Sequence, residues 1–333
     1  TGTLGTYAQL EVNPLQKLTL LLGGRYDRVN INGLYDLDVE SLDNNRQLGV
    51  FVPRLSALYK LAPDLKLRAG YARGYRAPQA FDEDLHIETV GGAALFTRLS
   101  PDLQTEHSDS YSASLNYSLD RGALQANFVL EGFHTRLHNP FVIADQQELP
   151  SGVAVATKRN GEGATVQGLN AEVNLAAGEK WLLQAGFTLQ SARFDVEEEL
   201  WAPENLTEFN ADSVVSTRNI LRTPNAYGFF SVGYRPNDRF SLDWSGLVTG
   251  SMPVAHVVDP ETEFTVIKDT PAFFENNLRA SYRFLLSEDT RLEISGGVQN
   301  LFNSYQTDFD RGADRDAGYI FGPSRPRTLF AGV

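Results

Sequence analysis

The amino-acid sequence predicts an all-β protein, a transmembrane antiparallel β-barrel. Three observations lead to this prediction. Apolar and polar residues alternate along many segments, as in a strand with one apolar and one polar face. Several of these segments reach about ten residues, where strands of soluble proteins usually have about five or six. Short and long links also alternate between the segments along the whole chain.

The alternation is clearest in residues 111–119, where tyrosine, alanine and leucine occupy one face and serine or asparagine the other. The same pattern recurs, in chain order, at residues 124–131, 169–175, 181–189, 240–244 and 292–298. In a barrel the apolar face contacts lipid and the polar face lines the lumen. We therefore expect the following polar residues to face the lumen: Ser112, Ser114, Asn116, Glu131, Glu172 and Glu293.

The links between the segments fall into two classes. Short turns, rich in residues that favour turn dihedrals, are expected at residues 13–14, 62–64, 120–122, 177–179, 236–238 and 287–289. Long links are expected at about 31–47, 77–106, 139–160, 197–222, 253–271 and 304–323. About thirteen strands result. Short periplasmic turns opposite long extracellular loops are typical of transmembrane barrels.

Composition excludes several classes of protein. The chain has no cysteine, so it forms no disulfide, thiolate metal site or cysteine nucleophile. Its 42 acidic and 29 basic residues give a net charge of −13, which argues against a nucleic-acid partner. No apolar run approaches the roughly 18 residues of a membrane-spanning helix. We find no catalytic motif and expect no enzyme. A soluble β-sandwich lectin or adhesin would explain the alternation but not the strand length.

Several motifs resemble the C-terminal barrel region of TonB-dependent outer-membrane receptors, and the resemblance extends over the whole chain. In order, they lie at Tyr7–Glu11, Leu22–Asp27, Pro53–Tyr59, Gly74–Pro78, Val298–Tyr305 and Gly322–Val333. The segment Gly74–Pro78 is similar to the family's G-F-R-A-P motif with tyrosine in place of phenylalanine. Residues 77–87 and 315–319 resemble the branch of the family found in Bacteroidota.

The resemblance implies a receptor in the outer membrane of a Gram-negative bacterium. It would import a scarce metal complex by TonB-coupled active transport, with a ferric siderophore as the first expectation, followed by haem or cobalamin. Residues 1–333 would form about the last 13 strands of a 22-stranded barrel in the lipid bilayer. The family's plug domain, through which the TonB–ExbB–ExbD complex acts, is absent from this sequence, so we expect a fragment. A passive porin is the alternative. No cofactor is implied.

The long links supply the candidate ligand-facing residues. Acidic and aromatic side chains there would contact a cationic or metal-bearing ligand, although solvated loops with internal Arg–Asp pairs show the same composition. A calcium loop at 308–316 would lack the bidentate glutamate at its twelfth position. The five histidines show no metal-ligand motif, although His134 and His138 share a strand face. The candidates are Asp82, Asp84, His86, Trp201, Asp308, Asp310 and Tyr319.

Overall fold

One long antiparallel sheet makes up most of the protein. The computed structural model describes residues 2–36, 41–43, 45–79, 95–148, 154–203, 214–259, 264–312 and 315–333. The strands of the sheet are β1 (Gly2–Leu15), β2 (Leu18–Ile31), β5 (Arg46–Lys60), β6 (Leu65–Arg76), β8 (Glu106–Arg121), β9 (Leu124–His138), β12 (Gly163–Ala177), β13 (Trp181–Trp201), β15 (Ala226–Tyr234), β16 (Phe240–Thr249), β19 (Phe273–Leu285), β20 (Arg291–Gln299) and β21 (Thr328–Gly332). A further strand, β14 (Val215–Asn219), pairs with the end of β13.

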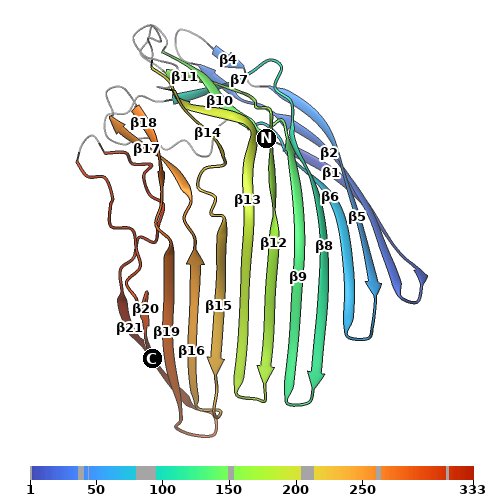
Figure 1. Cartoon of the computed structure of the whole chain (residues 1–333), viewed down its shortest axis with the longest axis vertical. Coiled ribbons are helices and arrows are strands. Elements are labelled where there is room, and N and C mark those ends of the chain that lie inside the picture. Colours follow the sequence, from blue (N-terminus) through green and yellow to red (C-terminus); the bar gives the residue numbers. More distant parts are fainter. Residues whose placement is uncertain are drawn as a thin grey trace.

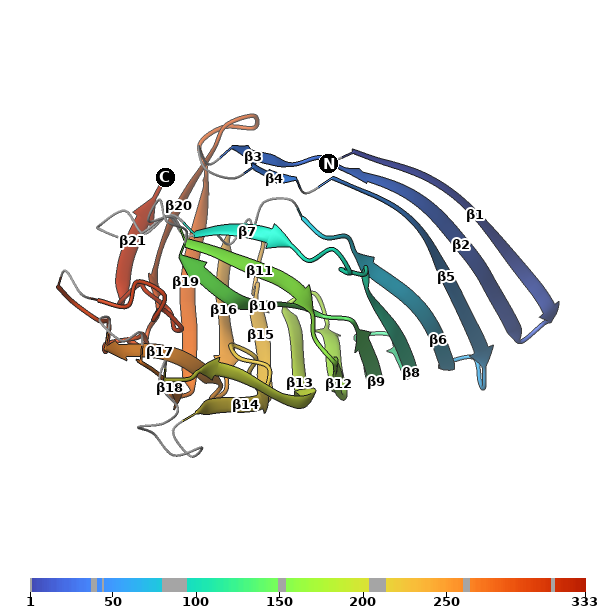
Figure 2. The ribbon, with the colours of Figure 1, turned by 90° about the horizontal axis from the view of Figure 1, so that it is seen from above.

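The strands pair in the order in which they follow one another along the chain, so the sheet is an up-and-down meander (Figure 1). Strands β12 and β13, for example, pair without a slip from Ala177↔Trp181 to Ala164↔Phe194. Figure 2 shows that the sheet curves around a hollow side, with β1 and β21 at the two ends of the curve. The all-β antiparallel fold predicted from the sequence is confirmed. No helix in the described part of the chain could span a membrane.

Tight turns connect the strands at one end of the sheet, called here the turn end. Gly122 and Gly178 have φ angles of 63° and 59°, which glycine adopts without the steric cost that a Cβ would bring. Both positions lie in turns that the sequence predicts, between β8 and β9 and between β12 and β13. The turns predicted at residues 120–122 and 177–179 are therefore confirmed.

The predicted turn at Asn13 and Pro14 is wrong. Both residues belong to β1, and the chain reverses at Gln16 and Lys17 instead. A proline, which has no amide N–H to donate, is tolerated in an edge strand, and β1 pairs only with β2 in the described part of the sheet. The β1–β2 register shifts immediately around the proline.

The opposite end of the sheet, called here the link end, carries strands that the sequence did not predict. The long links contain β3 (Leu34–Asp36), β4 (Ser41–Asp43), β7 (Leu95–Leu99), β10 (Phe141–Glu148), β11 (Ala154–Asn160), β17 (Pro253–Asp259) and β18 (Phe264–Asp269). β17 and β18 form a hairpin. β11 pairs with β10 in antiparallel and with β7 in parallel orientation. Figures 1 and 2 together place this three-stranded sheet at the link end, over the hollow side.

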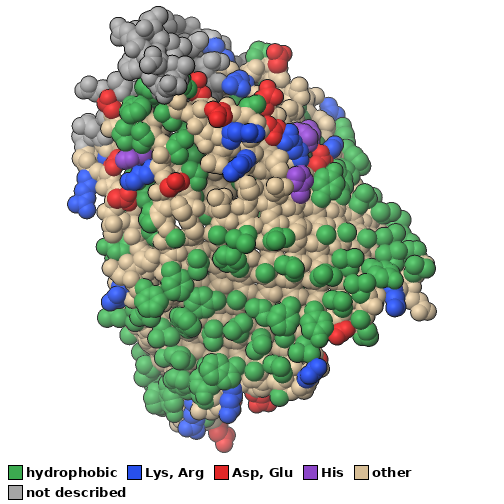
Figure 3. Space-filling model, viewed as in Figure 1, with side chains coloured by type: hydrophobic (Ala, Val, Ile, Leu, Met, Phe, Trp, Pro, Cys, Tyr) green, Lys and Arg blue, Asp and Glu red, His purple; other side chains and the backbone are tan. Residues whose placement is uncertain are grey.

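The convex outer face of the sheet is apolar across its middle. Cross-strand pairs such as Tyr117↔Phe128 and Leu115↔Leu130 place large apolar side chains in rows, and Leu130 is 53% exposed. Figure 3 shows this face as a broad hydrophobic band, with charged side chains gathered at its two ends. A band of this kind is the surface that a transmembrane barrel presents to lipid.

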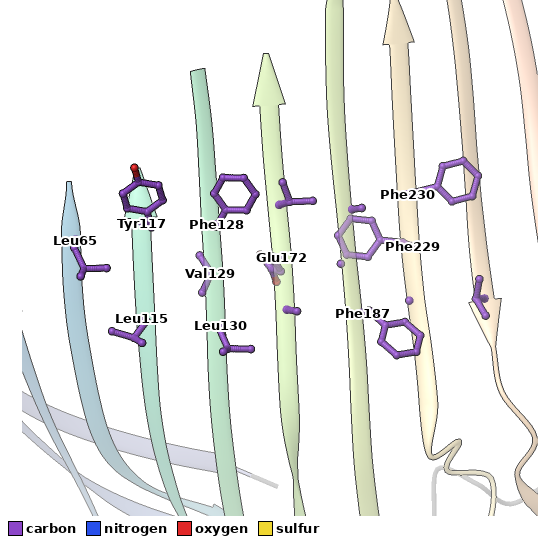
Figure 4. A pocket seen from close by; sticks show the side chains of 16 residues that line it. Leu65, Leu115, Tyr117, Phe128, Val129, Leu130, Glu172, Phe187, Phe229 and Phe230 are labelled. Carbon is purple, nitrogen blue, oxygen red and sulfur yellow. The ribbon is translucent and has the colours of Figure 1, made fainter. Parts of the chain in front are cut away.

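An apolar hollow of about 790 Å³ lies in the middle of the sheet, between β6 and β16 (Figure 4). Phe128 and Leu130 on β9 and Phe187 on β13 are among its lining side chains. Small residues, Ala171 on β12 and Ala185 on β13, lie between these larger ones and leave the space open.

Two small buried clusters in the described part of the chain lie toward the link end. One contains Val29 and Ile31, with Leu48 and Tyr75 packed against them. The other contains Met252, Val254 and Tyr319. A wall with one face toward lipid and one toward a lumen has no single core, so packing concentrates where links cover the sheet.

Candidate functional site

The inner face of the sheet carries polar side chains that bond to one another across strands. Asn116 on β8 and Asn127 on β9 exchange amide hydrogen bonds, each 3.2 Å long, and Asn127 Nδ2 also donates to Ser118 Oγ at 3.1 Å. These polar residues alternate along each strand with the apolar residues of the outer face, because successive side chains of a strand point to opposite sides of the sheet. The result is a hydrogen-bonded polar surface rather than a set of isolated polar groups.

This polar surface continues onto the next strands. Asn170 Nδ2 on β12 donates to Glu131 Oε1 on β9 at 3.2 Å, and Thr188 Oγ1 on β13 donates to Asn170 Oδ1 at 2.9 Å. Near the C-terminus, Glu293 accepts a hydrogen bond from Arg283 at 3.2 Å and lies 3.6 Å from an Arg279 nitrogen. The inner wall therefore offers both donors and acceptors.

The chain that follows β20 folds onto the link end through a buried asparagine. Asn300 has a φ of 49°, in the left-handed region that asparagine tolerates better than most residues. Its side-chain amide donates to the carbonyls of Ser304 and Arg325, and its Oδ1 accepts from the Ser304 amide at 2.8 Å. Asn300 thus satisfies backbone groups of a segment that lies in no sheet.

Gln306 performs a similar role further along this segment. Its side chain is buried, and its Nε2 donates to the Tyr319 carbonyl at 3.0 Å. Its Oε1 accepts from the amides of Phe321 and Gly322. Gln306 therefore joins the two arms of the link 304–323.

Three charged or phenolic side chains fasten this link to the β17–β18 hairpin. Tyr319 is buried, and its hydroxyl donates to Asp308 Oδ2 at 3.1 Å. Lys268 Nζ on β18 donates to the same oxygen at 3.0 Å and lies 5.0 Å from the centroid of the Tyr319 ring. One carboxylate oxygen therefore joins the hairpin to both arms of the link.

A histidine makes a second contact between the same elements. His256 on β17 stacks on Tyr319, with centroids 3.8 Å apart, and its Nε2 lies 2.9 Å from Asp310 Oδ2. Asp316 Oδ2 accepts a hydrogen bond from the amide of Val257. The link is therefore held by aromatic stacking, ion pairing and backbone capping together.

These contacts perturb the acid–base properties of the link. Burial by itself would raise the pKa of Asp308, but hydrogen bonds from Lys268 and Tyr319 outweigh it and lower that pKa. The pKa of Asp310 is lowered in the same way, by His256 and the Asp316 amide against the effect of burial. The pKa of Lys268 is raised, first by its contact with Tyr319 and then by Asp308. Burial is the main cause that raises the pKa of Tyr319.

Four of the seven candidate ligand-facing residues contact the same hairpin. Asp308, Asp310 and Tyr319 do so through the contacts above. Trp201, at the end of β13, packs edge-on against Phe264 of β18, with ring centroids 4.7 Å apart. Tyr319 is only 2% exposed, so its side chain organises the link from inside. Asp308 and Trp201 keep part of their surface open to solvent. A ligand-facing role for these residues stays a prediction.

The other three candidates, Asp82, Asp84 and His86, lie outside the described residues. Sequence reasoning did not assign roles to Lys268 and His256, which organise the acidic link. Neither residue carries a local signal, because their partners lie 40 and 54 residues away in the sequence. The sequence signal for their role was that one predicted link contains a lysine and a histidine while another is rich in acidic residues.

Among the described residues, the side-chain group with metal-ligand geometry consists of His107, Asp109 and His138. Asp109 and His107 precede the outward-facing Tyr111 by two and four residues on β8, so they belong to the outer face. This group is therefore separate from the inner wall.

Comparison with known proteins identifies the family. The family model for the TonB dependent receptor-like β-barrel matches residues 1–301. No curated protein matches the sequence.

Among solved structures, P. aeruginosa FpvA bound to an iron-loaded pyoverdine aligns with a TM-score of 0.67 at 17% identity, covering 99% of this chain and 37% of that one. A mutant of the ferric enterobactin receptor PfeA from Pseudomonas aeruginosa gives 0.62 at 19% identity, covering 99% and 44%. The siderophore receptor PirA from Acinetobacter baumannii gives 0.65 at 13% identity, covering 99% and 45%. The chain thus spans less than half the length of these receptors.

The family match covers nearly the whole sequence and agrees with the meander, the apolar outer band and the polar inner wall. The chain belongs to the TonB-dependent receptor β-barrel family, whose members are outer-membrane proteins of Gram-negative bacteria and act as transporters rather than enzymes.

Proposed function

We propose that the chain forms the wall of an outer-membrane receptor that imports a scarce metal complex by TonB-coupled active transport. The observation that carries the proposal is the division of one sheet into an apolar outer face and a hydrogen-bonded polar inner face. A simple lipid-facing wall needs only the first face. The second face suits contact with a hydrated lumen or with a polar domain inside it.

In this proposal residues 1–333 are the C-terminal part of a larger barrel. Strands β1 and β21 each have one unpaired edge in the described sheet, and hydrocarbon tolerates no open edge. Further strands would pair with both edges and close the wall. A plug domain, absent from this sequence, would rest on the polar inner face and carry the contact to the TonB–ExbB–ExbD complex. The fraction of the solved receptors that the chain covers supports this arrangement.

The proposed cargo is a ferric siderophore, with haem or cobalamin next. The support is that the three solved structures are described as receptors of iron-loaded pyoverdine, of ferric enterobactin and of a siderophore. The link end would capture the cargo. We assign the capture surface to the β17–β18 hairpin with Trp201, Asp308 and Asp310, and to the link that contains Asp82, Asp84 and His86. Tyr319 would hold this surface in shape.

A transport assay tests the proposal. The gene is deleted from its host and restored on a plasmid, and uptake of labelled ferric siderophores, haem and cobalamin is measured in cells with and without TonB. We expect one class of iron complex to require the receptor, and this uptake to stop when TonB is deleted or the proton-motive force is dissipated. Equal uptake without TonB would instead identify a passive porin.

The capture surface has its own test. Asp310→Asn and Trp201→Ala should raise the ligand concentration that gives half-maximal uptake by about tenfold, with the amount of receptor in the membrane unchanged. Glu179→Gln, in the turn between β12 and β13 at the other end of the barrel, is the matched control. Equal effects of the control and the capture variants would contradict the assignment.

A further inference from the structure

Two histidines and an aspartate lie side by side on the outer face, beyond the apolar band at the link end. His107 on β8 is directly opposite His138 on β9. Asp109, two residues along β8, belongs to the next outward-facing pair. The tyrosines Tyr71 and Tyr111, whose centroids are 5.2 Å apart, separate this group from the apolar rows below. With this tyrosine pair at the membrane interface, the group would lie beyond the hydrocarbon layer, on the side of the external medium.

The three side chains have the geometry of a metal-ligand set. Their donor atoms all lie within 4.8 Å of one another. The two imidazole rings stack with centroids 4.6 Å apart and planes 14° from parallel. His138 Nε2 lies 3.3 Å from Asp109 Oδ2. Two ligand atoms that are each about 2.0–2.1 Å from a tetrahedral ion are about 3.3–3.4 Å apart, so this edge of the tetrahedron already has its proper length.

The carboxylate of Asp109 is held in a fixed orientation by neighbouring residues. Its Oδ1 accepts hydrogen bonds from the Tyr71 hydroxyl at 2.6 Å and from Arg73 Nε at 2.9 Å. Its Oδ2 accepts one from Arg73 Nη2 at 3.1 Å. An ionised carboxylate offers about four acceptor positions. Three are used, and the remaining position is on Oδ2, the oxygen near His138.

An ion pair between Asp109 and Arg73 explains the tyrosine and arginine contacts, but it does not explain the histidines. The pair needs neither His107 nor His138, yet each ring has a nitrogen within 4.8 Å of an Asp109 carboxylate oxygen. In metal sites a ligating carboxylate is itself commonly hydrogen-bonded by outer residues that fix its direction. Tyr71 and Arg73 occupy that outer position here.

We propose that His107, Asp109 and His138 bind a divalent transition-metal ion of the zinc class, with the fourth position open to water. Imidazole nitrogen with one carboxylate suits Zn²⁺, Ni²⁺ and Cu²⁺. Ca²⁺, which takes six to eight oxygen ligands, is not suited. The positive charge of Arg73 weakens the site, so binding is expected in the micromolar range rather than at the affinity of a structural zinc. A bound ion would join β8 to β9 at their external ends.

A binding measurement with matched variants tests the site. The protein is extracted in detergent with an affinity tag that lacks histidine, treated with a chelator and titrated with Zn²⁺ by calorimetry and with Co²⁺ by visible absorption. We expect binding of one ion per chain at this site. His107→Gln and His138→Gln should each weaken it at least tenfold. Ca²⁺ should not compete.

His134→Gln is the control, because His134 is on the same strand and face but its Nδ1 lies 3.1 Å from Gln167 Oε1, outside the group. It should bind the ion as the unaltered protein does. The two glutamine variants leave the Asp109–Arg73 contact intact, so folding is not at stake. The proposal would be overturned if no Zn²⁺ bound at concentrations about 100-fold above the expected micromolar range. An equal loss of Zn²⁺ affinity in His134→Gln would also overturn it.

Discussion

Tyr319 and His256 stack with their ring centroids 3.8 Å apart, and this contact places the 304–323 link against the β17–β18 hairpin. The two residues are far apart in the sequence and belong to different links, so the stack joins segments that local structure would leave separate. Three acidic side chains of the link are bonded around this stack.

Replacing the buried ring should release the link. We expect Tyr319→Ala to reduce the local stability of the link by about 3–5 kcal/mol, the usual cost of removing a buried aromatic side chain. Amide hydrogen exchange of residues 304–323, followed by mass spectrometry in detergent, measures the effect. Ile320→Ala, at a neighbouring side chain that is 55% exposed, should leave exchange unchanged. Similar exchange in both variants would contradict a clamping role for Tyr319.

Acid should loosen the same contact. The pKa values of Asp308 and Asp310 are lowered below their ordinary value of 3.8, so the folded link binds protons less readily than the unfolded one. Their contribution to stability is therefore fully present above about pH 4 and is lost as pH falls below 3.8 through the folded values. The protection of the link's amides, taken relative to the intrinsic exchange rate at each pH, should fall over that range. Asp308→Asn with Asp310→Asn should exchange faster at pH 7 and lose this acid dependence.

Alkaline pH should act on the other partner. The pKa of Lys268 is raised above 10.5, so its contribution is present below 10.5 and is lost as pH rises through the higher folded value. We expect the link to lose amide protection at alkaline pH, measured as for the acid range. Lys268→Met should abolish this alkaline loss and keep the acid loss. An unchanged alkaline transition in Lys268→Met would show that another group causes it.

Asn300 provides a test that separates backbone strain from hydrogen bonding. Asn300→Gly keeps the left-handed conformation but removes bonds to Ser304 and Arg325, which should cost about 1–3 kcal/mol. Asn300→Ala removes the same bonds but, unlike glycine, keeps a Cβ at a φ of 49°, so it should be about 1–2 kcal/mol less stable than the glycine variant. Denaturant unfolding in detergent measures both. A glycine variant that is no more stable than the alanine variant would refute the strain component.

Depth in the membrane should decide the cost of a charge on the outer face. Leu130→Arg, in the apolar band, is expected to destabilise the folded barrel by about 2–4 kcal/mol in lipid vesicles. His134→Arg, four residues further along the same face of β9, should cost about 0–1 kcal/mol because it lies near the tyrosine pair. Urea unfolding of vesicle-inserted protein compares them. Equal costs would mean that the band does not contact lipid.

The sequence predicted the wall well because the wall obeys a local rule. Lipid on one face and water on the other force an alternation of residue types that any window of the strand displays, as in residues 111–119. The turn predicted at Asn13–Pro14 is wrong because the preference of proline for turns is also a local signal. Proline fits within β1 because β1 has no second partner strand in the described sheet, and this depends on the fold.

The candidate site was harder to predict because its contacts are not local. The acidic residues of 304–323 were visible as a group, but their partners Lys268 and His256 come from another link. The same holds for β7, which pairs with a strand that begins 59 residues later. Five-residue strands without a clear alternation give no local signal, so only the folded arrangement reveals them.

The parallel pairing of β7 with β11 has a mechanical consequence for the link end of the sheet. The two strands belong to separate links, yet they share an unbroken register from Leu95↔Ala154 to Leu99↔Lys158. Neither link can swing aside alone without shearing that register. Movement of either strand therefore draws the other with it, and a load applied to β7 is carried by β11 as well.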